Sequence, residues 1–380
     1  MENFIAYNPT KLHFGKDVMN DLDKTIADYG KKVLLVYGKN AIKQNGLYDK
    51  ILNKLKKAEI EVYEYSGIKP NPVAEDVDEA AEIGRLNNVD IILAVGGGSV
   101  IDSAKIISIT IPVKHSCWDF YEGKRKPEKA ISLIAVLTLA ATGTEMNPFA
   151  VIQNNKTRQK LGWGNPLIFP RHSYLDPQNT FTVPGNQTAF GIVDLVAHCL
   201  EAYFAKGEAD LSDRFVISII KEAIEIGPLL LNNLKNYEYR ERIMYAATCA
   251  LNGICFNGRT SGDWGVHDIG HIFSLLYDIA HGASLSIAYP AWLKLQKERI
   301  PERISELGFN LFGVKSAGET IVSFEKFFKT LGCPLSLKEA NIKNFDKKEI
   351  FDVMKLNKVN GSNHKMTEDD YLKIIELTCK

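Results

Sequence analysis

The stretch Val89–Ser108 reads VDIILAVGGGSVIDSAKIIS, and it decides the fold class of the N-terminal half. Its first seven residues are mostly apolar and branched, as expected for a strand that is buried on both faces. Three glycines and a serine follow, and the remaining residues have the pattern of a buried helix. A strand that runs through a glycine-rich turn into a helix is typical of the βαβ units that build parallel sheets.

Similar strand-like runs lie on both sides of this stretch, at Lys31–Tyr37, Glu61–Tyr65 and Ile131–Leu137. Most are preceded by a segment of helical period, such as Tyr48–Glu59 or Val73–Leu86. Strands that alternate with helices of this length predict a parallel sheet with helices on both faces. We therefore expect a Rossmann-like α/β domain.

The pattern changes near Pro184, after which long segments of helical period follow one another with no comparable strand. These segments are Asn186–Phe204, Ser212–Leu231 and Tyr239–Leu251. The change predicts an α/β nucleotide-binding domain over residues 1–180 and an all-helical domain over residues 181–380. Ligands of open α/β sheets bind beyond the carboxyl ends of the strands, so we expect the active site in the cleft between the two domains.

Composition excludes several classes of function. The 46 Lys and Arg residues balance 46 Asp and Glu residues, which argues against a nucleic acid or an anionic membrane as the main partner. No apolar run approaches the roughly 20 residues that span a bilayer, and the first residues lack the layout of a secretion signal. The six cysteines form no CxxC pair, so neither a zinc knuckle nor a disulfide framework is expected. A cytoplasmic protein is predicted.

Three strand ends carry polar, flexible residues: Tyr37–Asn40, Gly96–Ser99 and Thr138–Glu145. Backbone N–H groups of a glycine-rich turn approach a phosphate closely, and the following helix N-terminus favours an anion. The spacing is neither GxGxxG nor that of a Walker loop, and a tight turn that needs glycine only for its backbone angles is the alternative. Together the three ends favour a nucleotide or dinucleotide ligand.

The helical half contains a candidate metal site. Asp194 and His198 are four residues apart, which places them on one helix face, and His267 and His271 repeat this spacing. His281 follows. A single histidine on an apolar helix is usually a core residue, but two such pairs in so few segments favour a catalytic divalent metal. Oxygen and nitrogen ligands without a thiolate suit Zn²⁺ or Fe²⁺.

Taken together, these segments resemble the iron-containing (group III) alcohol dehydrogenases, in particular their butanol-dehydrogenase-like branch. The resemblance covers essentially the whole chain. It rests on FxxxNPTKLHFG from Phe4, KPNP at Lys69–Pro72, GGGSVIDSAK at Gly96–Lys105, TGTEMN at Thr142–Asn147, DLVAH at Asp194–His198 and HDIGH…HG at His267–Gly282. It implies the dehydroquinate synthase-like architecture, with a nucleotide-binding N-terminal domain and an all-helical, metal-binding C-terminal domain.

The resemblance also implies roles for individual residues. Asp194, His198, His267 and His281 match the family's metal ligands, and His271 matches a residue beside the nicotinamide that is not a ligand. Phe149 and Trp264 resemble parts of the substrate wall. The matching cofactor-binding positions are Gly38, Asn40, Asn71, Gly97, Gly98, Ser99, Asp102, Thr138, Leu139, Thr142, Lys160 and Thr182.

The implied reaction is the reversible, NAD(P)H-linked reduction of an aldehyde to a primary alcohol. His271 is the candidate for delivering a proton to the alkoxide, and orientation of a metal ligand is its alternative role. A glycerol-type dehydrogenase and a sugar-phosphate cyclase of the same superfamily are alternatives, although the segments around the metal have few of the cations that a phosphorylated substrate needs. A metal-dependent hydrolase is disfavoured by the three polar strand ends.

Two further expectations concern the cofactor and the assembly. Lys39 stands where NAD-using relatives often have an aspartate, so we expect it to favour NADP(H), with a solvated loop lysine as the alternative. The apolar run Phe4–Phe14 predicts a strand at a sheet edge, and relatives often dimerise through this region. We therefore expect a homodimer formed through the N-terminal strand, with a small aldehyde or alcohol as the other partner.

Overall fold

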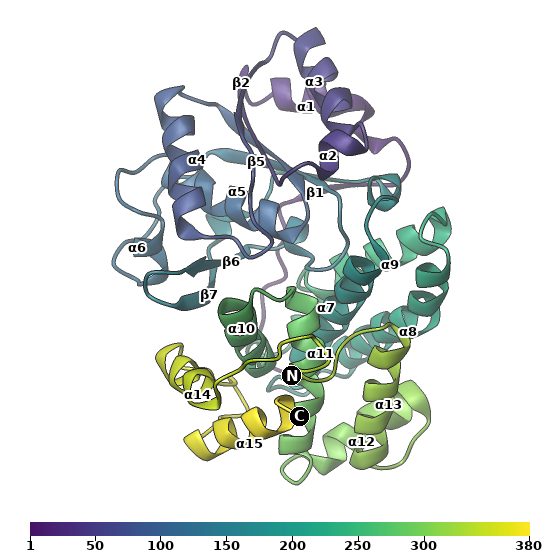
Figure 1. Cartoon of the computed structure of the whole chain (residues 1–380). Coiled ribbons are helices and arrows are strands. Elements are labelled where there is room, and N and C mark those ends of the chain that lie inside the picture. The colour runs from purple at the N-terminus through teal and green to yellow at the C-terminus, as the bar shows by residue number, and fades with distance from the viewer. The chain divides into compact units, whose positions relative to one another are not determined.

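The computed structural model describes all residues from Met1 to Lys380, which form two compact units (Figure 1). One unit comprises Tyr7–Val183, and the other comprises Met1–Ala6 together with Pro184–Lys380. The first six residues thus group with the helical unit and not with residues 7–180, since the Glu2 N–H donates to the Gly258 carbonyl at 2.9 Å. None of the helices combines the length and the apolar character that a membrane crossing requires.

The α/β unit contains a six-stranded parallel sheet with the strand order β1-β8-β5-β4-β2-β3. Its central strands are buried almost throughout, which explains why their sequences are continuously apolar rather than alternating. The strands of this sheet are β1 (Lys11–Phe14), β2 (Lys32–Tyr37), β3 (Glu61–Tyr65), β4 (Ile91–Gly96), β5 (Ser132–Leu137) and β8 (His172–Leu175).

Helices cover both faces of this sheet. Apolar side chains of α1 and α3 share a core with every second residue of β2, including Val33 and Leu35. Helices α4 and α5 pack together, and α5 contacts β4 and β5. The helices of this unit are α1 (Leu22–Ala27), α2 (Ala41–Gln44), α3 (Leu47–Lys57), α4 (Ala74–Leu86), α5 (Gly98–Thr110) and α6 (Trp118–Tyr121). The predicted α/β architecture with a parallel sheet is confirmed.

Two features of the α/β unit differ from the expectations. The predicted N-terminal strand Phe4–Phe14 is wrong in length, because only Lys11–Phe14 forms β1 and residues 4–10 have no regular structure. Strand β1 pairs in parallel with β8 and occupies one edge of the sheet. The second feature is an antiparallel pair, β6 (Phe149–Asn154) with β7 (Gln159–Gly164), which the sequence pattern did not reveal.

The helical unit consists of nine α-helices joined by loops and short turns of 3-10 helix. Its helices are α7 (Gly185–Tyr203), α8 (Asp210–Asn232), α9 (Tyr237–Ala250), α10 (Gly265–Tyr277), α11 (His281–Gln296), α12 (Pro301–Phe312), α13 (Ala317–Thr330), α14 (Lys347–Leu356) and α15 (Glu368–Thr378). Helix α7 is buried along most of its length and packs against α8, α9 and α11. It therefore forms the centre of the unit.

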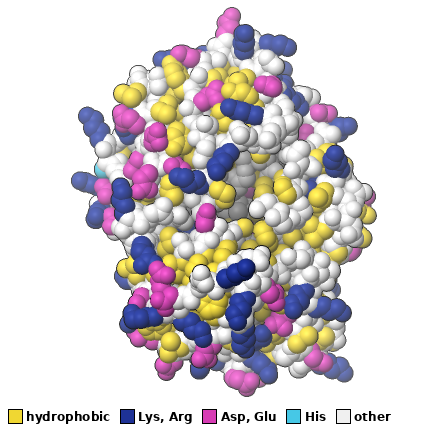
Figure 2. Space-filling view, viewed as in Figure 1, with side chains coloured by type: hydrophobic (Ala, Val, Ile, Leu, Met, Phe, Trp, Pro, Cys, Tyr) yellow, Lys and Arg dark blue, Asp and Glu magenta, His cyan; other side chains and the backbone are white.

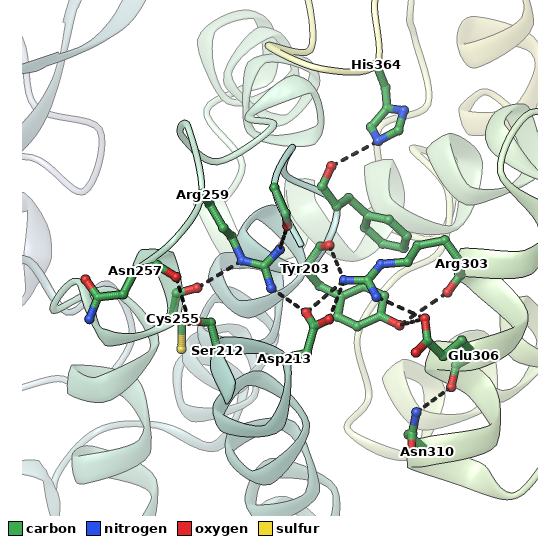
Figure 3. A network of polar contacts seen from close by, with 12 residues as sticks. Tyr203, Ser212, Asp213, Cys255, Asn257, Arg259, Arg303, Glu306, Asn310 and His364 are labelled. Carbon is green, nitrogen blue, oxygen red and sulfur yellow. Dashed lines mark hydrogen bonds and ion pairs between the residues drawn. The ribbon is translucent and has the colours of Figure 1, made fainter. Parts of the chain in front are cut away.

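A network of charged side chains joins α7, α8 and α12 within this unit (Figure 3). The Asp213 carboxylate accepts hydrogen bonds from the guanidinium groups of Arg259 and Arg303. The Arg303 guanidinium also lies 3.5 Å from the centre of the Tyr203 ring, at the last residue of α7. Arg259 is buried, so its pairing with a carboxylate offsets the cost of removing its charge from water. The network fixes the C-terminal end of α7.

The surface carries both signs of charge. Lys and Arg side chains alternate with Asp and Glu side chains over the face seen in Figure 2. This mixture agrees with the zero formal net charge of the chain.

Candidate metal centre and cofactor-binding loops

The four predicted metal ligands come from three helices of the helical unit. Asp194 and His198 lie one turn apart on α7, His267 is the third residue of α10, and His281 is the first residue of α11. The structure brings three of them together, and His198 lies beside these three. Ligand atoms of Asp194, His267 and His281 all lie within 4.8 Å of one another. The His198 ring stacks on the His267 ring, with their centres 4.7 Å apart.

The Asp194 carboxylate lies in the middle of this group. Its Oδ1 atom is 3.6 Å from His198 Nδ1, 3.9 Å from His267 Nε2 and 3.7 Å from His281 Nε2. These separations are too long for hydrogen bonds. Two ligand atoms bound tetrahedrally at about 2.1 Å to one ion lie about 3.4 Å apart. The spacing therefore fits ligands around a shared cation better than it fits a set of hydrogen-bonded side chains.

The donor atoms also need a partner. Asp194 Oδ1, His198 Nδ1 and His267 Nε2 are buried, and none of them makes a hydrogen bond. A buried polar atom without a partner costs about 1–3 kcal/mol, so three such atoms in one place are unusual. A divalent cation would accept a lone pair from each of them. One carboxylate, three imidazoles and no thiolate resemble a catalytic zinc or iron site more than a structural one.

A glycine allows α11 to deliver His281 to this place. A Cβ atom on Gly282 would lie 2.0 Å from the Phe190 carbonyl oxygen of α7. Any other residue would push the start of α11 away from α7, and His281 would move with it. The pair His281–Gly282 thus combines a candidate metal ligand with the glycine that allows α11 to lie close to α7.

Glu201 contacts this group of side chains, although the sequence pattern did not indicate it. It lies seven residues after Asp194 on α7, on the same face of the helix. Only 1% of its side chain is exposed. Its Oε1 atom lies 2.7 Å from His267 Nδ1. Burial lowers the pKa of His267, but the Asp194 and Glu201 carboxylates outweigh burial and raise it to about 9. By contrast, burial lowers the pKa of His198 to about 4.

His271 lies next to the ligand group without joining its three-residue core. It is one turn beyond His267 on α10 and is buried. Its ring centre is 5.4 Å from that of His281. His271 is therefore placed next to the candidate metal ligands without being one of the three grouped donors.

The predicted cofactor residues lie in the α/β unit, where the carboxyl ends of β2, β4 and β5 are neighbours in the sheet. The glycine turn after β4 packs against the loop after β5. A Cβ atom on Gly98 would lie 2.6 Å from Thr142 Cγ2, and one on Gly97 would lie 3.2 Å from Leu139 Cβ. The absence of side chains at these two positions allows the loops to meet closely at the N-terminus of α5. Thr138 joins the same edge, since its N–H donates to the Gly96 carbonyl.

Asp102 holds the loop after β5 in place. Its Oδ1 atom accepts a hydrogen bond from Thr144 Oγ1 at 2.6 Å, and its Oδ2 atom accepts one from the Val151 N–H at 2.8 Å. Lys105, one turn further along α5, is completely buried and donates to Thr144 Oγ1 at 2.6 Å and to the Phe149 carbonyl at 2.7 Å. Burial lowers the pKa of Lys105 to about 8, although the Asp102 carboxylate opposes this. Asp102 therefore fixes the conformation of the segment that follows β5.

Two predicted cofactor residues from distant parts of the chain form a pair. Lys160 of β7 donates to Asn71 Oδ1 at 2.7 Å, and both side chains are buried. Ser99, at the start of α5, donates to the Pro70 carbonyl, which precedes Asn71. The KPNP segment is thus tied both to the glycine turn and to β7.

Three of the predicted cofactor residues, Gly38, Lys39 and Asn40, follow β2. The Gly38 carbonyl accepts a hydrogen bond from the Gly67 N–H at 3.0 Å, while Lys39 and Asn40 are exposed. Thr182 is also exposed, and its Oγ1 accepts from the Asn45 amide at 3.5 Å. The side chains of Lys39, Asn40 and Thr182 are therefore accessible to a ligand.

The two predicted wall residues lie in different units. Phe149, at the start of β6, has 49% of its surface exposed, and its ring covers Gly164 of β7. Trp264 precedes α10 with a φ of +67°, and its ring centre lies 5.4 Å from that of His267, nearly perpendicular to it. Both rings offer apolar surface beside predicted site residues.

Comparisons with known proteins agree with these observations. A family model described as "Iron-containing alcohol dehydrogenase" matches residues 9–177. A second, described as "Fe-containing alcohol dehydrogenase family, C-terminal", matches residues 188–378. Together they cover almost the whole chain.

Individual relatives are similar over most of their length. The chain is 41% identical to the probable NADH-dependent butanol dehydrogenase 1 of Bacillus subtilis (strain 168), over 99% of both chains. It is 33% identical to the NADPH-dependent aldehyde reductase YqhD of Escherichia coli (strain K12), over 89% of both. Its fold matches the crystal structure of the NADH-dependent butanol dehydrogenase A of Thermotoga maritima with a TM-score of 0.96 and 39% identity, over 100% of this chain and 99% of that one.

The two family models, these relatives and the donor group on α7, α10 and α11 lead to one assignment: the chain belongs to the iron-containing alcohol dehydrogenase family.

Proposed function

We propose that this protein catalyses the reversible reduction of aldehydes to primary alcohols, with a nicotinamide dinucleotide as hydride donor and one divalent metal as Lewis acid. The observation that carries the proposal is the donor group of Asp194, His198, His267 and His281, three of whose buried atoms have no hydrogen-bond partner. The relatives named butanol dehydrogenase and aldehyde reductase support the substrate class.

When bound, a divalent ion supplies a Lewis acid that polarises the carbon–oxygen group of the substrate and stabilises its developing negative charge. The protein's own residues do the remaining work. Asp194 contributes a negative charge that helps to retain a cation, and the three imidazoles set its position.

In the same proposal, the loops after β2, β4 and β5 hold the dinucleotide. The N–H groups at the start of α5 bind the pyrophosphate, with Gly97 and Gly98 permitting its close approach. His271 delivers the proton that the product alcohol needs, because it lies one turn from His267 and its ring is next to that of His281. Phe149 and Trp264 each offer apolar surface to the substrate.

An activity screen tests the proposal. We expect short aliphatic aldehydes to be reduced with consumption of a reduced nicotinamide cofactor, and primary alcohols to be oxidised in the reverse direction. Absence of turnover with every aldehyde and both cofactors, in protein shown to contain metal, would reject the assigned reaction.

We further propose that NADP(H) is preferred over NAD(H), although relatives of both kinds are known. Lys39 is exposed directly after β2, where it can reach the 2′-phosphate that distinguishes NADP, and no carboxylate stands at this position to repel it. A partly exposed contact of this kind contributes roughly 1–3 kcal/mol, or about 5–150-fold in preference. The exposed side chain of Asn40 offers a second hydrogen bond.

The Lys39→Asp variant is expected to reverse this preference, because a carboxylate repels the phosphate and accepts from a ribose hydroxyl. The ratio of kcat/KM for NADPH and NADH should fall by about 5–150-fold or more. Lys50→Asp, an exposed lysine on α3, is the matched control and should leave the ratio unchanged. A wild-type preference for NADH, or an equal ratio in Lys39→Asp, would overturn the proposal.

We also propose that the protein is a cytoplasmic homodimer that associates through its N-terminal segment. Its six cysteines are free thiols, as a reducing compartment maintains them. Strand β1 is paired on one side only, and the residues before it expose Phe4, Ile5 and Tyr7 by 47%, 92% and 69%. An unpaired strand edge and exposed apolar side chains are both surfaces that a second copy of the chain would cover.

Light scattering at micromolar concentration should therefore give the mass of two chains. Ile5→Asp should weaken the dimer, whereas Leu86→Asp, which changes another exposed apolar residue, on α4, should not. The mass of a single chain for the wild type at this concentration would disprove the dimer.

A further inference from the structure

We propose that Glu201 is a positioning residue of the metal site, which fixes both the tautomer of His267 and the conformation of the backbone that carries it. This inference rests on the proposed metal site but assigns a new role within it. Glu201 is buried, comes from α7, and contacts the first turn of α10 across 66 residues of chain.

The first step concerns the imidazole of His267. Its Nδ1 atom lies 2.7 Å from Glu201 Oε1, while its Nε2 atom faces Asp194 and makes no hydrogen bond. A neutral imidazole carries its proton on one nitrogen only, and a carboxylate accepts but cannot donate when it is ionised. When His267 is neutral, Glu201 therefore holds its one proton on Nδ1 and leaves the lone pair of Nε2 for a metal.

The second step concerns the backbone. Glu201 Oε1 also accepts from the His267 N–H at 3.2 Å, and Glu201 Oε2 accepts from the Trp264 N–H. These amides belong to the start of α10, where helix N–H groups have no partner within the helix. No side chain from the residue before α10 caps this end. Glu201 supplies that cap from another helix.

The third step follows from the number of donors. One carboxylate receives three N–H groups: two from the backbone and one from the imidazole. An amide side chain has only one acceptor oxygen, and its NH₂ group would face at least one of these donors. Glu201→Gln keeps the size of the side chain but cannot satisfy all three, so the role requires a carboxylate.

The same contact sets the position of an aromatic wall. Trp264 has a left-handed backbone, with a φ of +67°, and its N–H is held by Glu201. Its ring is stacked parallel to that of Phe256 and stands edge-on to His198 and His267. A tryptophan in this conformation is strained, so an external hydrogen bond is needed to hold it. Glu201 thus orients both His267, a proposed metal ligand, and Trp264, a predicted residue of the substrate wall.

Asp370 provides a matched control. It is also a carboxylate with 1% of its surface exposed, and it caps the start of α15 by accepting from the Thr367 N–H at 3.0 Å. Arg299 donates two further hydrogen bonds to it. Asp370→Asn therefore removes a buried, helix-capping carboxylate of the same unit that has no contact with the proposed ligands.

The test measures Zn²⁺ affinity by competition with a chromogenic chelator in the full-length protein, together with thermal unfolding of the metal-free form. We expect both Glu201→Gln and Asp370→Asn to lower the unfolding temperature, but only Glu201→Gln to weaken Zn²⁺ binding, by about 10–100-fold. Equal Zn²⁺ affinity in Glu201→Gln and the wild type, or equal losses in both variants, would overturn the role of Glu201. If the wild type itself failed to bind one Zn²⁺, the proposed metal site would fall instead.

A measurement on the wild type covers the case in which Glu201→Gln does not fold. In Zn²⁺-loaded protein with ¹⁵N-labelled histidine, the His267 ring should bear a slowly exchanging Nδ1 proton, identified by its proximity to the Trp264 amide proton. A His267 ring with the proton on Nε2, or an Nδ1 proton that exchanges rapidly with water, would contradict the inference.

Discussion

The His267→Ala variant is expected to lose both the bound metal and nearly all aldehyde reduction, the largest effect that the structure predicts. His267 contributes one of the buried donor atoms, and its removal also leaves Glu201 without its imidazole partner. Changes in residues that merely support a metal ligand cost about 10–100-fold in affinity or activity, so loss of a ligand should exceed about 100-fold. Metal content and kcat should fall together.

The control for this variant is His115→Ala, which removes a histidine of the α/β unit whose Nδ1 atom lies 3.5 Å from Asp119 Oδ2. It should keep stoichiometric metal and normal turnover. If His267→Ala also kept one metal per chain and full activity, the four assigned ligands would be wrong.

The second large effect is expected for Gly98→Val, which should abolish cofactor binding while the metal stays bound. A valine places methyl groups where the pyrophosphate must approach, and its Cβ atom would also collide with Thr142 at 2.6 Å. The loss of two hydrogen bonds to a charged phosphate costs about 3–6 kcal/mol, which is more than about 100-fold in affinity. Titration of the reduced cofactor by its fluorescence measures this loss.

A glycine of β7 serves as the control. A Cβ atom on Gly162 would meet only Val151, at 3.9 Å, so Gly162→Val tests the cost of a valine outside the proposed site. It should bind the cofactor like the wild type. Unchanged affinity in a folded Gly98→Val protein would place the pyrophosphate elsewhere.

The buried strands and long helices were predictable because their side-chain patterns are strong. The run at Lys31–Tyr37 becomes β2 (Lys32–Tyr37), and the predicted helix Asn186–Phe204 becomes α7 (Gly185–Tyr203). In both cases burial on nearly every side leaves a continuous apolar pattern.

The edge elements were not predictable in the same way. In β7, exposed and buried residues are mixed, and its sequence QKLGWG contains two glycines, which are unfavourable in a strand. The apolar residues Phe4 and Ile5 suggested a strand, yet the segment before Lys11 has no sheet partner within the chain. Pairing at an edge depends on distant segments, here β8, and short local patterns do not contain that information.

The candidate site also contains residues that were predictable from the sequence and one that was not. Histidine is rare, so the spacing of Asp194 with His198 and of His267 with His271 was visible in the sequence. Glutamate is common on helices and is usually exposed, so Glu201 did not stand out. Its importance depends on the packing of α7 against the start of α10, which only the structure shows.

The central claim is that one divalent metal, held by the donor group on α7, α10 and α11, is required for aldehyde reduction with NADPH. The most direct test removes the metal with a chelator, measures turnover of a short aliphatic aldehyde, and then restores Fe²⁺ or Zn²⁺ in increasing amounts. We expect activity to vanish with the metal and to return in full at one equivalent per chain. Full activity in metal-free protein, or a return only at several equivalents, would contradict the account.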